Sequence, residues 1–175
     1  VDLDVENGQK LKENLNNGEK SDIVEFVKGD VSNNNDWINI VKICIEKFGK
    51  IDILFNNAGI MMSSDGTLED TNIDVWNKTI NVNLTSVYFG CKNVMPFLIG
   101  KGGVIINTAS FVGLMGSAAA QIAYTASKGG VISLSQELAA IYAKNNVRVV
   151  PLCPGPLHTE LLMKFLYTDE KKQRR

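Results

Sequence analysis

The sequence predicts a single α/β domain in which helices alternate with the strands of a parallel sheet. Short apolar runs with the composition of strands alternate along the chain with longer stretches in which apolar residues recur every three or four positions. The length of 175 residues suits one domain, and an apolar content of 45% is enough for a sizeable core. Alternation of this kind is the pattern of a parallel α/β sheet.

The first third of the chain is expected to contain two helices and two strands. Residues 7–17 form a polar stretch that is compatible with a helix, and residues 23–27 have the composition of a strand. A second helix follows, with Ser32 as its predicted cap and Gly49 as its predicted end. Residues 51–55 form the next predicted strand.

The remainder of the chain is expected to repeat this alternation with longer helices. A helix is predicted over residues 72–99, a buried strand over 104–108, and a second long helix within 117–145. The last predicted strand covers residues 147–150 and is expected to stop at the prolines that follow it.

The composition argues against several classes of partner. With a net charge of −1 and a pI of about 5.9, the chain offers nothing that favours nucleic acid or a membrane surface. No apolar stretch approaches the roughly 18 residues that a membrane span requires. Cys44, Cys91 and Cys153 lack C-x-x-C or metal spacing, which is typical of reduced thiols in a cytoplasmic protein. His158 cannot build a metal site by itself, so no metal is expected.

The most informative feature for function is Tyr124, with Lys128 four residues later and Ser110 fourteen residues earlier. On a helix, side chains at positions i and i+4 lie on one face. An ammonium there is expected to lower the tyrosine pKa from about 10 towards neutral pH, so that the tyrosine can exchange a proton with a substrate oxygen. A serine hydroxyl can hold the same oxygen. Taken alone, such a pair is more often a surface tyrosine and lysine at the spacing of an ion pair.

Other motifs surround this pair along the chain. In order, they are Asn56-Asn57-Ala58-Gly59, Val82-Asn83-Leu84, Ser110, Tyr124 with Lys128, and Pro154-Gly155. With these motifs the chain resembles the classical short-chain dehydrogenase/reductase family, from Asp2 to about Thr159. The resemblance implies a doubly wound, Rossmann-like parallel sheet. The interval from Ser110 to Tyr124 is about one residue longer than is usual in the family, a difference that a loop can absorb.

The chain departs from the family pattern at both ends. Family members begin with a strand and a glycine-rich turn that holds the cofactor pyrophosphate at a helix N-terminus, and no G-x-x-x-G-x-G stretch occurs in this sequence. Val1 corresponds to the end of the family's second strand, and Arg175 lies within the substrate loop. We therefore expect residues 1–175 to form one Rossmann-like domain that is incomplete at both ends.

By resemblance, four residues form the catalytic set of an NAD(H)-dependent oxidoreductase that interconverts a secondary alcohol and a carbonyl. Tyr124 is expected to be the general acid/base, and Lys128 is expected to lower its pKa and to contact the nicotinamide ribose. Ser110 is expected to hydrogen-bond the reacting oxygen. Asn83 is expected to hold a water that connects Lys128 to solvent; without its neighbours in the sequence it would be interpreted as an exposed helix asparagine.

The expected cofactor is NAD rather than NADP because of Asp2. A carboxylate at the end of the second strand can accept bonds from both ribose hydroxyls, and it repels a 2′-phosphate. The alternative is a turn or capping aspartate, although Asp4 suits the capping role better. Asp30 and Val31 are expected to meet the adenine ring, with a plain strand-end aspartate as the alternative.

The remaining expected cofactor contacts follow two other strands. Asn56, Ala58 and Gly59 lie at the carboxyl edge of the sheet, where small residues let the backbone approach a cofactor and asparagine amides can tie strands together. The contacts implied around the nicotinamide are Pro154, Gly155, Leu157 and Thr159, together with Tyr124 and Lys128.

The expected partners are a small apolar alcohol or ketone and further copies of the chain. Apolar residues after Gly59 and after Ser110 suit such a substrate. The helices around residues 83–97 and 118–142 resemble the pair that forms the family's shared oligomer interface, in a homotetramer or homodimer. Two alternatives stay open. One is a non-catalytic fragment without cofactor binding, and the other is a sugar-nucleotide epimerase or dehydratase, which shares Y-x-x-x-K.

Overall fold

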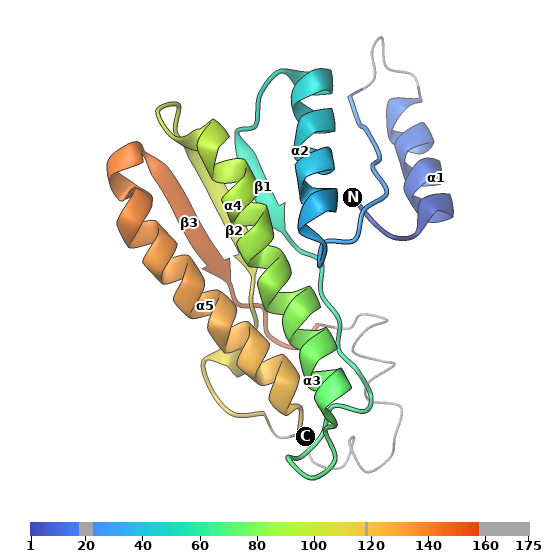
Figure 1. The fold of residues 1–175 in the computed structure, drawn as a ribbon, viewed down its shortest axis with the longest axis vertical. Helices are drawn as coiled ribbons and strands as arrows, with labels where there is room; N and C mark the ends of the chain where they lie inside the picture. The colour runs from blue at the N-terminus through green and yellow to red at the C-terminus, as the bar shows by residue number, and fades with distance from the viewer. Residues whose placement is uncertain (18–22, 118, 158–175) are drawn as a thin grey trace.

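The fold is built on a parallel sheet, as predicted (Figure 1). The computed structural model describes residues 1–17, 23–117 and 119–157. The strands are β1 (Ile53–Asn56), β2 (Gly103–Thr108) and β3 (Val147–Leu152), in the spatial order β1-β2-β3. Both pairs are parallel, with Leu54 opposite Ile105 and Ile105 opposite Val149. All three carboxyl ends therefore meet at one edge of the sheet.

The helices occupy the connections between the strands. They are α1 (Val5–Asn16), α2 (Asn34–Phe48), α3 (Ile73–Ile80), α4 (Ser86–Leu98) and α5 (Ile122–Tyr142). A π-helical turn (Asn81–Thr85) joins α3 to α4, and 3₁₀ turns lie at Phe111–Gly113 and Ala143–Asn145. The helix predicted over residues 72–99 is therefore confirmed as one continuous rod. In the part of the chain that the structure describes, no helix is long and apolar enough to cross a membrane.

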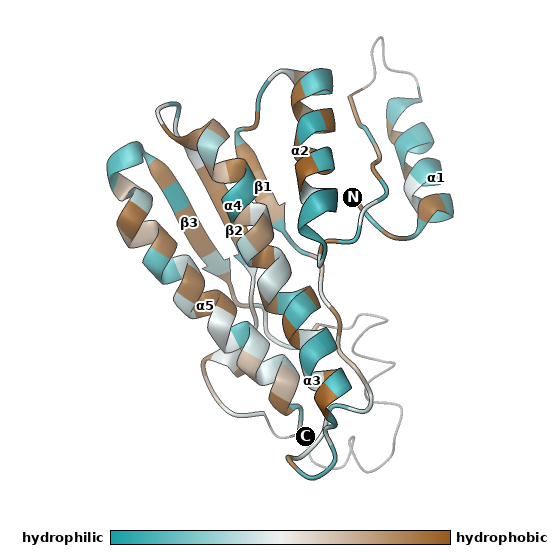
Figure 2. Cartoon of the chain, viewed as in Figure 1, coloured by the Kyte–Doolittle hydropathy of each residue, from teal (hydrophilic) through white to brown (hydrophobic). Residues whose placement is uncertain are grey.

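Two of these helices cover one face of the sheet. α5 packs on β2 and β3, α4 packs on β1 and β2, and α2 lies against α4 (Figure 1). Figure 2 shows mostly hydrophobic strands and a mostly hydrophilic α1, which buries no residue. On the opposite face of the sheet, Ile53 and Phe55 are exposed. The buried core consequently lies between the sheet and the layer of α2, α4 and α5.

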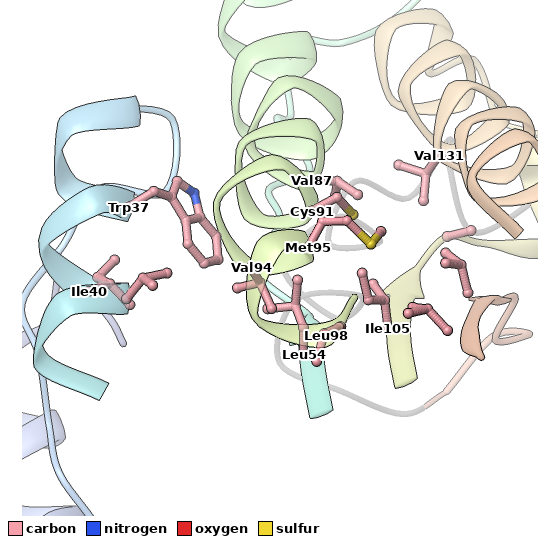
Figure 3. Close-up of a cluster of buried hydrophobic side chains, with 14 of the residues drawn as sticks. Trp37, Ile40, Leu54, Val87, Cys91, Val94, Met95, Leu98, Ile105 and Val131 are labelled. Carbon is pink, nitrogen blue, oxygen red and sulfur yellow. The ribbon is translucent and has the colours of Figure 1, made fainter. Parts of the chain in front are cut away.

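The core joins three helices to all three strands (Figure 3). Its labelled members are Trp37 and Ile40 of α2, Leu54 of β1, Val87, Cys91, Val94, Met95 and Leu98 of α4, Ile105 of β2 and Val131 of α5. Leu98, Ile105 and Val131 have no exposed surface. Each such side chain contributes roughly 1.5–3 kcal/mol of transfer free energy. The core therefore fixes α4 and α5 on the sheet.

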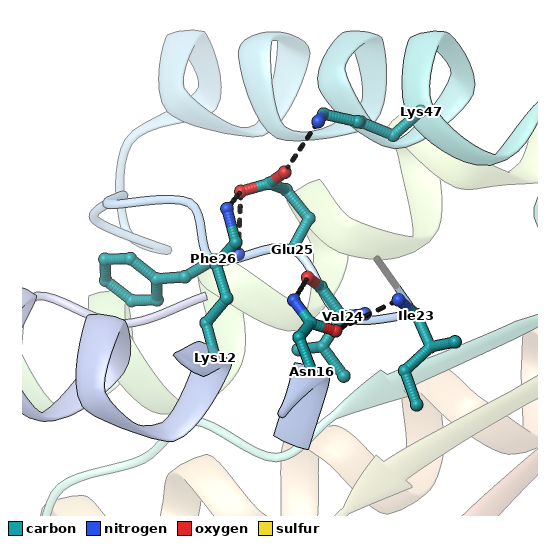
Figure 4. Close-up of polar contacts among 7 residues, drawn as sticks. All are labelled: Lys12, Asn16, Ile23, Val24, Glu25, Phe26 and Lys47. Carbon is teal, nitrogen blue, oxygen red and sulfur yellow. Dashed lines mark hydrogen bonds and ion pairs between the residues drawn. The ribbon is translucent and has the colours of Figure 1, made fainter. Parts of the chain in front are cut away.

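The prediction of a strand over residues 23–27 is wrong, because the segment is extended but forms no hydrogen-bonded ladder with a neighbouring strand. The isolated parallel bridge nearest to it pairs Asp2 with Lys28, directly after the segment. The Asn16 side chain binds its backbone instead, with Oδ1 accepting from the N–H groups of Ile23 and Val24 and Nδ2 donating to the Val24 carbonyl (Figure 4). β-branched residues favour a strand only where a partner strand supplies the ladder.

Glu25 joins this segment to two helices. Its carboxylate lies 2.7 Å from Lys12 Nζ of α1 and 3.1 Å from Lys47 Nζ of α2 (Figure 4). Hydrogen bonds from Lys12 and then Lys47 hold the Glu25 pKa at about 2. The ion pairs thus stabilise the position of α1 at the edge of the molecule.

Two further boundaries differ from the predictions. Helix α2 is capped by Asn33, whose side chain accepts from the Asn35 N–H, because the Ser32 hydroxyl is bonded to Asp30 Oδ1 instead. Gly49 ends α2 as predicted. β3 continues through Pro151, opposite Asn107, where the strand was expected to stop. Proline is tolerated there because, in the described sheet, β3 is an edge strand.

Candidate active site

Helix α5 presents Tyr124 and Lys128 on one face, as their spacing predicts. Lys128 Nζ lies 5.6 Å from the centroid of the Tyr124 ring. Lys128 is only 3% exposed, so the alternative of a surface ion-pair lysine is wrong. Nζ donates a 2.6 Å hydrogen bond to the carbonyl of Thr108, the last residue of β2. This bond ties the first turns of α5 to the carboxyl edge of the sheet.

Ser110 reaches the same place from the loop after β2. It is buried, and its hydroxyl accepts from the Val112 N–H at 3.5 Å at the start of the 3₁₀ turn. The turn closes on α5 at Gly113, where an added Cβ would lie 2.8 Å from both Lys128 C and Gly129 N. Because these are backbone atoms, only glycine lets the Ser110 loop approach the helix this closely.

The protonation of Tyr124 differs from the expectation. Burial raises the pKa of Tyr124 above its ordinary value of 10, and a hydrogen bond with Ser110 acts in the opposite direction. Burial also lowers the pKa of Lys128 from 10.5 to about 8. The predicted lowering of the Tyr124 pKa by Lys128 is therefore wrong for the protein alone, because desolvation disfavours the phenolate more strongly than its neighbours favour it.

Asn83 lies in the π-turn between α3 and α4 and is fully buried. Its Oδ1 accepts from the Ile60 N–H at 2.7 Å, and its Nδ2 donates to the Ile60 carbonyl at 2.9 Å and to Ser127 Oγ at 3.2 Å. The alternative of an exposed helix asparagine is wrong. Asn83 clamps the loop after β1 onto α5, and a π-turn at such a position is common at functional sites.

A cavity of about 420 Å³ brings together three of the four predicted catalytic residues and several nicotinamide-side residues, whereas Asn83 is not part of its lining. Ser110, Tyr124 and Lys128 form part of its wall. Its other predicted members are Gly59, Pro154, Gly155 and Leu157, and its apolar members include Met61, Phe111 and Val112. Thr159, the remaining predicted contact, lies outside the described residues.

A second cavity, of about 880 Å³, holds the predicted adenosine side. Its lining includes Asp2, Asp30, Val31, Ala58 and Gly59. It shares Asn57 and Gly59 with the first cavity, so the two cavities adjoin at the end of β1. Both volumes fall in the range of roughly 300–1,000 Å³ that suits small-molecule and cofactor sites.

The structure also shows local roles for three of the predicted cofactor residues. Asp2 Oδ1 accepts from the Asp4 N–H at 3.0 Å, and Asp30 Oδ1 accepts from the N–H and the hydroxyl of Ser32. Asp4 caps α1, as expected. Asn56 lines neither of the two cavities, because its amide points into the core and donates to Asn107 Oδ1 at 2.8 Å. Its expected role of tying β1 to β2 is confirmed.

Sequence reasoning missed two residues of this region. Gln121 lines the smaller cavity one helical turn before Tyr124, and its buried Oε1 has no hydrogen-bond partner. Asp65 is fully buried and bonds to the backbone of Ala123 and Tyr124. Gln121 falls within the range 117–145 predicted to contain a helix, and its place three residues before Tyr124 could have drawn attention to it. Asp65 follows two serines and precedes a glycine, a composition typical of an exposed turn, so no signal pointed to it.

Gly59 tests whether a dinucleotide fits between these residues. A Cβ at this position would lie 3.3 Å from Asn83 Oδ1 and 3.6 Å from Lys128 Nζ, so glycine leaves room for these two side chains where the cavities adjoin. Asp2 and Asp30 line the larger cavity, and Lys128, Ser110 and Tyr124 line the smaller one. The residues present therefore fit a cofactor with a ribose in each half.

Three comparisons relate the whole chain to known proteins. The short chain dehydrogenase family matches residues 1–170. A 3beta-hydroxysteroid dehydrogenase 2 of Eggerthella lenta is 40% identical over 92% of this chain and 61% of its own length. A trans-4-hydroxycyclohexanecarboxylate dehydrogenase of Sinomonas cyclohexanicum is 36% identical over 87% of this chain and 58% of its own. The crystal structure of levodione reductase superposes with a TM-score of 0.89 at 29% identity, covering 99% of this chain and 68% of that one.

Proposed function

The chain belongs to the short chain dehydrogenase family, and on this premise we propose that the intact protein is an NAD(H)-dependent oxidoreductase. It interconverts a secondary alcohol and a carbonyl. The observation that carries the proposal is the convergence of Ser110, Tyr124 and Lys128 on one cavity of about 420 Å³. The chain spans about 60% of the length of the two relatives, 61% and 58%, so the activity belongs to the protein as a whole.

Tyr124 is the proton donor in the reducing direction and the acceptor in the oxidising direction. Its raised pKa keeps the hydroxyl protonated at neutral pH, ready to donate to a carbonyl oxygen. The Ser110 hydroxyl binds the same oxygen and stabilises the charge that develops on it. The nicotinamide, when bound, supplies or accepts the hydride.

Lys128 and Asn83 hold this pair in place. The Lys128 ammonium, fixed by the Thr108 carbonyl, stabilises negative charge on Tyr124 as the proton leaves, and it can reach a ribose hydroxyl beside Gly59. Asn83 holds the backbone of Ile60, which follows Gly59 in the loop after β1. In this proposal Asn83 also anchors a proton relay that connects Lys128 with solvent.

The preference for NAD over NADP rests on Asp2. Its carboxylate lines the larger cavity together with Asp30, and two negative charges there oppose a 2′-phosphate. Pro154, Gly155 and Leu157 line the smaller cavity, where they would enclose the nicotinamide. Thr159 completes this set in the proposal.

The substrate is proposed to be a small, mainly apolar secondary alcohol or its ketone. The smaller cavity is lined by Met61, Phe111, Val112 and Leu157 beside the catalytic hydroxyls. The two relatives are named for a hydroxysteroid and a hydroxycyclohexanecarboxylate. A cyclic alcohol is therefore the first substrate class to examine.

We place the enzyme, in the same proposal, in the cytoplasm as a homotetramer or homodimer. All three cysteines are free. α4 and α5 lie in one layer on the sheet, with Tyr88 and Ile141 exposed, and this layer would form the subunit contact. Light scattering of the intact protein at micromolar concentration tests the assembly, and a strictly monomeric mass would overturn it.

A coupled absorbance assay tests the proposed reaction. The intact protein should oxidise cyclic secondary alcohols with NAD, or reduce the ketones with NADH, and Ser110→Ala should lower kcat by roughly 10²–10³-fold. Ser135→Ala, which removes a buried hydroxyl on α5 outside the lining of the cavity, serves as the matched control. Absence of turnover with every alcohol and ketone in a broad panel would overturn the proposal.

A further inference from the structure

Helix α5 lacks a cap from its own sequence. The residue at its N-cap position, Gln121, makes no side-chain bond to the first turn. The first amide groups of a helix have no partner within the helix and need one from elsewhere. For a helix that carries Tyr124 in its first turn, the source of that partner decides where the tyrosine sits.

The missing cap comes from Asp65, 58 residues earlier in the chain. Its Oδ1 accepts from the Ala123 N–H at 3.1 Å, and its Oδ2 accepts from the Tyr124 N–H at 2.8 Å. Asp65 has no exposed surface. A carboxylate at a helix N-terminus is favoured by the helix dipole, and bonds to an ionised acceptor are the stronger kind.

Further bonds hold the loop of Asp65 in place. The Thr71 hydroxyl donates to Asp65 Oδ1 at 3.4 Å and accepts from the Gly66 N–H at 2.8 Å. The Ile122 N–H donates to the Gly66 carbonyl at 3.4 Å. Three successive amides of α5, from Ile122 to Tyr124, are therefore bonded to Asp65 or its neighbour.

The same loop forms one wall of the cavity. Met61 lines it, and Ile60 is fixed by both amide atoms of Asn83. The loop is thus held at Ile60 by the π-turn and at Asp65 by α5. A shift at Asp65 would move Tyr124 relative to Ser110, which reaches the cavity from a different loop.

We propose that Asp65 is a positioning residue for Tyr124 in the reaction proposed above, on which this inference rests. Its carboxylate binds the amide of the catalytic tyrosine itself. It thereby sets the distance between the tyrosine hydroxyl and the substrate oxygen. Misplacement of a reacting group by about 1 Å can cost roughly 10²-fold in rate.

The test compares three variants of the intact protein. Asp65→Ala removes both acceptors, and Asp65→Asn keeps the shape and one acceptor oxygen. Ser135→Ala is the control, because Ser135 is equally buried on α5 and accepts from Asn107 Nδ2 at 2.9 Å, eleven residues beyond Tyr124. It removes a buried bond about 16 Å along the helix from the tyrosine.

Asp65→Ala is expected to lower kcat by roughly 100-fold, with the cofactor Kd and the substrate KM within about threefold of wild type. Asp65→Asn should recover a large part of the rate, to within about tenfold of wild type, and remains informative if the alanine variant does not fold. Ser135→Ala should keep kcat within about threefold. Hydrogen exchange should become faster at the Ala123 and Tyr124 amides in Asp65→Ala and not in Ser135→Ala.

The inference is overturned if folded Asp65 variants keep kcat as well as Ser135→Ala does. It is also overturned if exchange at the Ala123 and Tyr124 amides is unchanged in those variants. Absence of turnover in the wild-type protein would count against the proposed function. In that case hydrogen exchange would still show separately whether Asp65 holds the Ala123 and Tyr124 amides.

Discussion

Substitution of Lys128 by methionine should stabilise the protein at neutral pH while abolishing its activity. Lys128 is 3% exposed, and burial lowers its pKa from 10.5 to about 8. At about 1.36 kcal/mol per pKa unit, folding disfavours the charged form by roughly 3 kcal/mol. Methionine has similar size and no charge, but it loses the bond to the Thr108 carbonyl, which is worth about 1–3 kcal/mol. The expected net gain at pH 7 is about 1 kcal/mol.

The dependence of this effect on pH follows from the sign of the pKa change. The folded pKa of about 8 lies below the unfolded value of 10.5, so between these pH values the unfolded chain binds more protons. Stability of the wild-type protein should therefore rise by roughly 2–3 kcal/mol between pH 7 and pH 10 from this group. Tyr124, whose pKa is raised, acts in the opposite direction as the pH approaches and exceeds 10, where tyrosine ionises in the unfolded chain.

Urea unfolding at pH 7, 8.5 and 10, without added cofactor, measures both effects. The wild-type protein should gain stability relative to Lys128→Met as the pH rises. Lys144→Met, which alters an exposed lysine, should follow the wild type at every pH. A difference between wild type and Lys128→Met that stays constant from pH 7 to pH 10 would refute the reasoning, as would a variant that is much less stable at pH 7.

Three other predictions follow from the site. The intact protein should bind NADH more tightly than NADPH, and Asp2→Asn should narrow the difference; tighter NADPH binding in a fluorescence titration would disprove the role of Asp2. Gly113→Ala should destabilise by about 1–3 kcal/mol and lower kcat at least tenfold, because its methyl group would meet the backbone of α5; a fully active, stable variant would show that the loop is free to move. Asn83→Ala should lower stability by about 1–3 kcal/mol, since the half-buried Ile60 backbone loses both bonds; calorimetry that finds an unchanged Tm would contradict this.

Local geometry explains what could be predicted from the sequence. A spacing of four places Tyr124 and Lys128 on one helical face in any helix, and parallel strands bring Asn57 and Ser110 to one edge. The continuous helix over residues 72–99 was predictable from its apolar periodicity. Its π-turn was not, because one extra residue in a helical turn leaves no clear sequence pattern.

Features that depend on tertiary context escaped prediction. The segment at residues 23–27 has strand composition, yet its backbone bonds to Asn16 rather than to a ladder. The direction of the Tyr124 pKa change depends on how deeply the side chain is buried, and the spacing between Tyr124 and Lys128 in the sequence does not indicate burial. Asp65 binds the first turn of α5, 58 residues later in the chain. The residues around Asp65 have a composition typical of turns, which does not indicate such a long-range contact.

The central claim is that Tyr124 supplies the proton for a hydride-transfer reaction. Single-turnover stopped-flow measurement of NADH oxidation, with a ketone that the intact enzyme reduces, tests this claim in wild type and Tyr124→Phe. The rate should fall by roughly 10²–10⁴-fold, while the NADH dissociation constant stays within about twofold. A variant that keeps more than about a tenth of the wild-type rate at neutral pH would contradict the claim and would mean that the proton comes from another group.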